Sequence, residues 1–79
     1  MKTEMTEKDK NMRNFEICLA HYQGIRSEFL YTSDRAEVTA QINGETIPQE
    51  KQNGINRLAD LMFQAALELA EAQKLAFAE

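Results

Sequence analysis

The feature that most constrains this 79-residue chain is an apolar stripe near its C-terminus. The stripe repeats every three or four positions without a break, at Ile55, Leu58, Met62, Ala65, Leu69, Ala72 and Ala76. Because an α-helix has 3.6 residues per turn, this spacing predicts an amphipathic helix with one apolar face. Helices tolerate proline in their first turn, so we expect the helix to begin near Pro48 and to end near Ala78.

A helix of that length would be roughly 45 Å long, at about 1.5 Å per residue. A compact chain of this size is only about 30 Å across, so the helix should project beyond the rest of the fold. Burying a Leu or Phe side chain contributes about 1.5–3 kcal/mol, and several such residues lie beside the stripe. We therefore predict a homodimer formed by the C-terminal helices; the alternative is a helix that breaks and folds back near its end. The candidate self-association residues are Leu61, Phe63, Leu67, Ala70 and Phe77.

The N-terminal half allows two interpretations. Large apolar residues occupy every second position at Phe15, Ile17 and Leu19, followed by His21, which is the pattern of a half-buried strand. A second set of residues lies near helical spacing, namely Phe15, Cys18, Leu19, Tyr22, Ile25 and Phe29. We favour the strand, because Gly24 interrupts the run and β-branched and aromatic residues are typical of strands.

Two further runs, 25–31 and 36–42, fit the same sheet. A loop at 22–24 and a second loop at 32–35 give antiparallel registers that place the large apolar residues on a shared face. The predicted fold class is therefore α+β: a three-stranded antiparallel β-meander followed by one long C-terminal helix on its apolar face. The predicted domains are a flexible polar arm over 1–14 and one small domain over 15–79.

Composition limits how such a domain can be stabilised. The chain has one cysteine and one histidine, so it can form no internal disulfide and offers too few ligands for a structural zinc site. A domain of this size buries only about 60% of its unfolded surface, which favours oligomerisation as the source of extra stability. The lone thiol and the absence of an apolar leader predict a cytoplasmic location.

The charge distribution argues against nucleic acid as the main partner. The net charge is −4, and the whole excess lies in residues 36–79, which hold seven acidic and three basic residues. Binding to a phosphate backbone requires clustered Lys and Arg side chains, and neither half has such a cluster. An aromatic and basic surface could be formed by Tyr22, Tyr31, Arg26 and Arg35, but we assign Tyr31 to the core face, and the sequence has no aromatic-rich binding motif of that kind. Nucleic-acid binding remains the alternative function, through the arm residues Lys2, Lys8, Lys10 and Arg13.

Cys18 and His21 are the residue types of thiol catalysis, in which a histidine activates the nucleophile. On one strand their odd separation points them to opposite faces, and on a helix they would be neighbours without a third, orienting group. We therefore predict no enzymatic activity and no cofactor. The leading hypothesis is a protein-interaction module. Its predicted partner surface comprises Cys18, Ala20, Leu30, Glu68 and Glu71.

Overall fold

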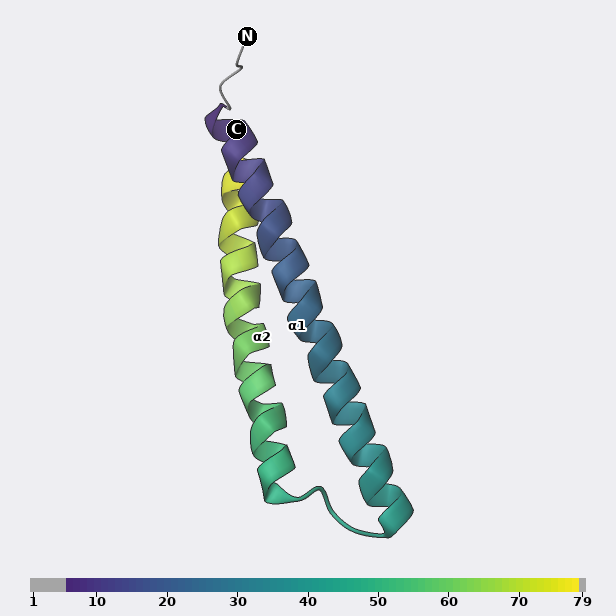
Figure 1. Ribbon diagram of the computed structural model, residues 1–79. Coiled ribbons are helices and arrows are strands. Elements are labelled where there is room, and N and C mark those ends of the chain that lie inside the picture. The colour runs from purple at the N-terminus through teal and green to yellow at the C-terminus, as the bar shows by residue number, and fades with distance from the viewer. Residues whose placement is uncertain (1–5, 79) are drawn as a thin grey trace.

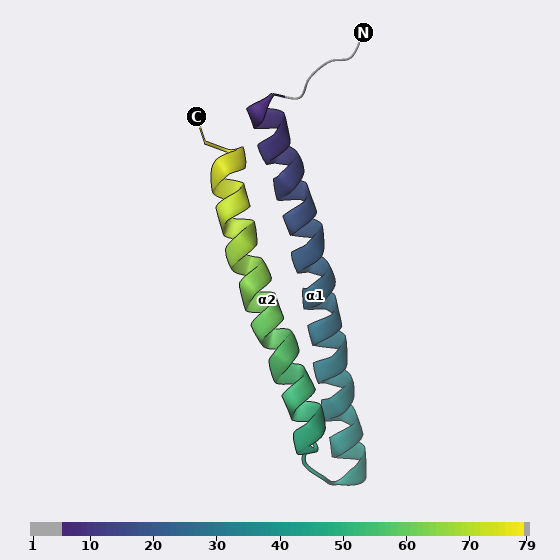
Figure 2. The same cartoon turned by 60° about the vertical axis from the view of Figure 1, so that its left-hand side comes forward.

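The structure, a computed structural model, describes residues 6–78 and is a helical hairpin. Helix α1 (Glu7–Asn43) and helix α2 (Gln49–Ala76) run antiparallel and are joined by the loop 44–48 (Figure 1). The helices lie side by side in a second view as well (Figure 2). The molecule is a rod of 63 × 23 × 17 Å, and no strand occurs between residues 6 and 78.

The predicted α+β fold with a three-stranded meander is therefore wrong. All three expected strands and the two loops between them lie inside α1, which continues unbroken for 37 residues. The helical spacing that we set aside is the one that the structure adopts. Phe15, Cys18, Tyr22 and the others of that set are half-buried, whereas Ile17, which only the strand pattern placed in the core, is 61% exposed.

Local interactions fix where α1 begins and ends. Thr6 is the N-cap: its hydroxyl oxygen accepts a hydrogen bond from the Asp9 N–H at 3.1 Å, and the Asp9 carboxylate accepts one from the Thr6 N–H at 3.3 Å. Gly44 ends the helix in the left-handed region, with φ of 67°. Residues 7–14 of the predicted arm are thus helical, and residues 1–5 lie outside the described part of the chain.

The C-terminal helix agrees with its prediction. It runs from Gln49 to Ala76, directly after Pro48, and the predicted apolar stripe is the face that packs against α1. Every residue of the stripe is buried or half-buried. The 3.6-residue period of α2 could be identified because charged residues fall only on its other faces.

The core between the helices is thin. The buried apolar residues are Ala36, Ala40, Ile55, Ala65, Ala72 and Ala76. Five of these six are alanine, and no large side chain among residues 6–78 is completely buried. Small side chains let two helices approach closely, but each removes little apolar surface from water, so the hairpin gains little free energy from this seam.

Candidate interaction surfaces

A row of exposed apolar residues follows one side of α2. Phe63, Ala70 and Phe77 are seven residues apart, with Leu67 between the first two. Seven residues make almost two helical turns, so the four side chains line one flank of the helix. Phe63, Leu67 and Phe77 are 64%, 56% and 59% exposed. We call this surface the α2 flank.

Leu61 was predicted to belong to the same surface, but helical geometry separates it. It precedes Phe63 by two residues, which is about 200° around the helix. Leu61 instead shares a seven-residue spacing with Glu68 and Leu75, on the other side of α2. Four of the five predicted self-association residues therefore share one flank, and Leu61 lies away from them.

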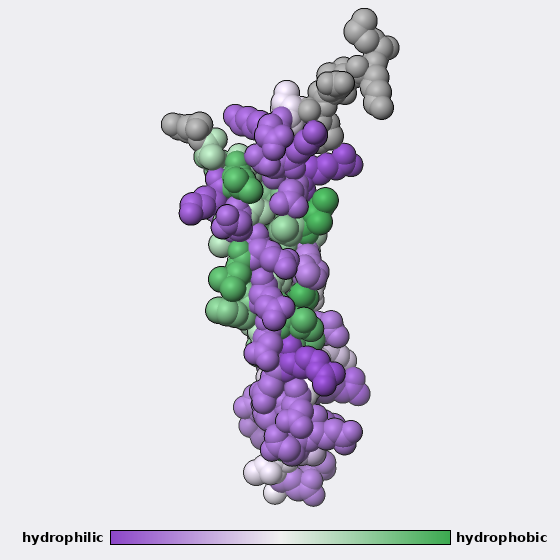
Figure 3. Space-filling view, turned by 90° about the vertical axis from the view of Figure 1, so that its left-hand side faces the viewer, coloured by the Kyte–Doolittle hydropathy of each residue, from purple (hydrophilic) through white to green (hydrophobic). Residues whose placement is uncertain are grey.

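The α2 flank continues onto α1 at the end of the hairpin where the termini lie. The rings of Phe15 and Phe77 meet edge to face, with centroids 5.3 Å apart and planes at 76°. This contact holds Phe77 at the junction of the two helices although much of its ring stays exposed. Seen from the side of α2, apolar side chains gather along both edges of the upper part, while the end near the loop is almost entirely polar (Figure 3).

Only part of the predicted partner surface comes together in the structure. Cys18, Glu68 and Glu71 line one groove between the helices, of about 320 Å³, together with Asn14, Ala72 and Leu75. Ala20 and Leu30 do not line this groove, although both are exposed. The structure thus brings three of the five predicted residues together. The other two belonged to the outer face of a sheet that the chain does not form.

The residues considered for catalysis do not form a catalytic arrangement. Cys18 is half-buried, and its thiol lies 4.0 Å from the side-chain oxygen of Asn14, measured from sulfur to oxygen. His21, one turn further along α1, is exposed and makes no recorded hydrogen bond with any residue of the described chain. Within residues 6–78, no three His, Cys, Asp or Glu side chains come close enough together to hold a metal ion.

Among the basic residues of the predicted arm, Lys8, Lys10 and Arg13 lie on α1. Lys8 and Lys10 lie in the first turns of α1 and alternate there with Glu7 and Asp9. Lys2 lies outside the described residues. Neither α1 nor α2 contains a stretch with the length and hydrophobicity that crossing a membrane requires.

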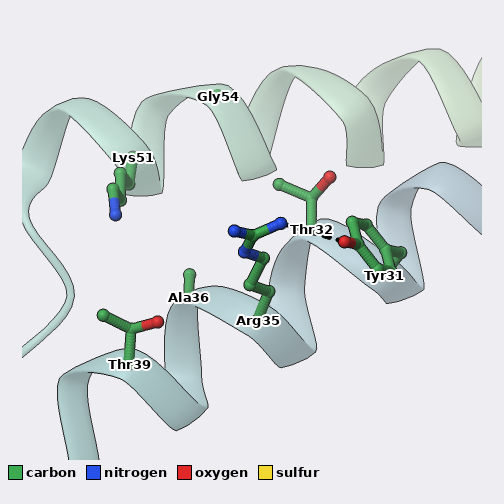
Figure 4. A pocket seen from close by; sticks show the side chains of 7 residues that line it. All are labelled: Tyr31, Thr32, Arg35, Ala36, Thr39, Lys51 and Gly54. Carbon is green, nitrogen blue, oxygen red and sulfur yellow. Dashed lines mark hydrogen bonds between the residues drawn. The ribbon is translucent and has the colours of Figure 1, made fainter.

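Sequence reasoning missed a second groove, at the polar end of the hairpin. It has a volume of about 310 Å³ and is lined by Tyr31, Thr32, Arg35, Ala36, Thr39, Lys51 and Gly54 (Figure 4). These residues come from the C-terminal third of α1 and the start of α2, so only the hairpin brings them together. The strand prediction had assigned Tyr31 and Arg35 to the end of a strand and a loop, and therefore gave no signal for the groove.

By its fold the chain is a two-helix hairpin with an apolar flank and two open grooves. Comparisons with protein-family models, with curated proteins and with solved structures found no match.

Proposed function

We propose that this protein is a small, cytoplasmic, non-enzymatic interaction module that self-associates through the α2 flank. The observation that carries the proposal is the contrast between the inside and the outside of the hairpin. Its buried seam is almost entirely alanine, whereas Phe63, Leu67 and Phe77 are more than half exposed. A chain that leaves several large apolar residues outside gains free energy by burying them against a second copy.

The order of residues along the flank favours an antiparallel pair of α2 helices. Ala70 lies seven residues from Phe63 and seven from Phe77, so the two phenylalanines are placed symmetrically about it. With Ala70 on a twofold axis, each Phe63 would face Phe77 of the second copy, and the small central side chain would allow close approach of the two helices. Lys74 follows Ala70 by four residues and would face Ala66 of the other copy, where its aliphatic stem can pack beside Leu67.

Such a pair would form a four-helix bundle from two hairpins. Four-helix bundles bury a central core between antiparallel neighbours, which a single hairpin cannot do. The polar, loop-proximal half of each hairpin would stay outside the contact and remain free for another partner. The lone half-buried cysteine supports a reducing compartment such as the cytoplasm.

Cross-linking between single cysteines tests this arrangement. In a Cys18→Ser background, one chain carries Phe63→Cys and a second, mass-tagged chain carries Phe77→Cys, and the mixture is treated with a short bismaleimide. The antiparallel pair predicts a mixed cross-linked dimer as the main product. Each variant alone should give little product, because the two copies of one position lie about 20 Å apart along the helix, at about 1.5 Å per residue.

A matched pair of variants, Val38→Cys and Ile42→Cys, serves as the control. Both residues are exposed and apolar, but they lie on α1 outside the flank. We expect no cross-link between these two chains. Cross-linking of Phe63→Cys to itself would show a parallel pair, and equal products from the control would show that collision, not a defined interface, produces the cross-links.

A further inference from the structure

The groove at the polar end of the hairpin concentrates positive charge in an acidic protein. Arg35 projects from α1 and Lys51 from α2, and both charged ends point into the space between the helices (Figure 4). No acidic residue lines the groove. The chain as a whole has a net charge of −4, so this local excess of two positive charges stands out from the average surface.

The structure does not neutralise these two charges. Within residues 6–78, neither Arg35 nor Lys51 forms an ion pair. Lys51 also lies in the first turn of α2, where the partial positive charge of the helix N-terminus disfavours a cation. Two like charges that face one gap repel each other, and an anion placed between them would remove that repulsion.

Hydrogen-bond donors line the same space. Arg35 donates one hydrogen bond through Nη1 to the Tyr31 hydroxyl oxygen at 2.9 Å, and its guanidinium carbon lies 6.0 Å from the centre of the Tyr31 ring. This contact orients the guanidinium and leaves its other N–H groups available, because Arg has five donors. Thr32 and Thr39 add hydroxyl groups to the lining. Gly54 adds no side chain, and an added Cβ there would meet no atom within 4 Å, so the groove is open on the α2 side.

We propose that this groove binds a phosphate group, held between the Arg35 guanidinium and the Lys51 ammonium. A phosphate dianion matches the two positive charges, and its oxygens can accept hydrogen bonds from both cations and from the threonine hydroxyls. The volume of about 310 Å³ is at the lower end of the range for small-molecule sites. Two sources of the group fit the groove: free phosphate, or a small organic phosphate monoester whose apolar part contacts the Tyr31 ring and Ala36.

The test is a titration of the ¹⁵N-labelled full chain, followed by NMR at pH 7.5 and constant ionic strength. The probes are inorganic phosphate, phenyl phosphate and, as a singly charged control, benzoate. We expect saturable amide shifts confined to residues 31–39 and 50–55 with both phosphates, and at least tenfold weaker binding of benzoate. Tighter binding of phenyl phosphate would identify an organic monoester as the ligand, and equal binding would identify free phosphate; either result supports the site.

Variants of the two cations separate this site from general attraction of anions. Arg35→Gln and Lys51→Gln should each weaken phosphate binding at least tenfold, whereas Arg26→Gln and Lys8→Gln remove the same charge outside the groove and should leave it unchanged. The proposal is overturned if no saturable shifts appear, or if all four variants weaken binding equally. It is also overturned if Arg35→Gln and Lys51→Gln change the mass of the assembly without affecting phosphate, because carboxylates of a second copy would then occupy the groove.

Discussion

The glycine that caps the end of α1 and a glycine inside α1 have opposite effects on stability. Gly44 has a φ of 67°, and its N–H donates hydrogen bonds to the carbonyl oxygens of Ala40 and Gln41 at the end of the helix. A side chain is disfavoured in that left-handed conformation by about 1–2 kcal/mol. Gly24 lies in the middle of α1 with helical backbone, and a Cβ added there would meet no atom within 4 Å. Glycine inside a helix is less favourable than alanine by about 0.5–1 kcal/mol, so Gly24 weakens the helix that it belongs to.

Alanine substitutions should therefore change stability in opposite directions. We expect Gly44→Ala to lower the free energy of unfolding by about 1 kcal/mol and Gly24→Ala to raise it by about 0.5–1 kcal/mol. Urea denaturation followed by circular dichroism measures both, at one fixed protein concentration because self-association adds to apparent stability. A destabilising Gly24→Ala would contradict the account, since a turn at 22–24 between two strands needs glycine and a continuous helix does not.

The two helices differ in how clearly their sequences specify them. In α2 the apolar stripe and the charged residues occupy separate faces, so the helix and its inward face were predicted correctly. In α1, exposed apolar residues such as Ile17, Tyr31 and Val38 lie outside the face that packs against α2. Together with more buried apolar residues two positions away, they produce an alternating pattern that is typical of a strand, although the segment is helical. Gly24 and the polar run 32–35 then looked like turns. What favours the helix is local hydrogen bonding along 37 residues, with no proline to interrupt it.

The candidate surfaces also differ in how far they can be predicted from the sequence. The α2 flank could be predicted because all its residues lie on one helix, whose geometry relates their positions directly. The two grooves could not be predicted, since each combines residues of α1 with residues of α2 and depends on the register of the hairpin. Cys18 and Glu68 share a groove for this reason, although they are far apart in the sequence.

Removing the α2 flank should weaken self-association without unwinding α2. We expect the double variant Phe63→Ser/Leu67→Ser to raise the dimer dissociation constant by at least tenfold, because each exposed side chain contributes about 1.5–3 kcal/mol when buried. The double variant Val38→Ser/Ile42→Ser loses comparable exposed apolar groups from α1 and should leave the constant unchanged. Sedimentation equilibrium measures both, and helix content by circular dichroism checks folding. Equal weakening by the two double variants would contradict a specific role for the flank.

As a whole molecule, the hairpin is long for its mass. Its radius of gyration is 18.1 Å, whereas a compact chain of this length would have about 12 Å. A rod has a large surface relative to its volume, so a single hairpin buries less than a globular domain of the same size. Pairing along the apolar half of the rod would bury the flank of both copies and leave the basic groove at each polar end accessible.

The most direct test of self-association is the mass of the purified protein in solution. We would measure it by multi-angle light scattering across a hundredfold range of concentration. The account predicts a mass of twice the 9.1 kDa chain over most of that range, with dissociation only at the lowest concentrations. A mass of one chain at every concentration, with the helix content of the hairpin retained, would contradict it.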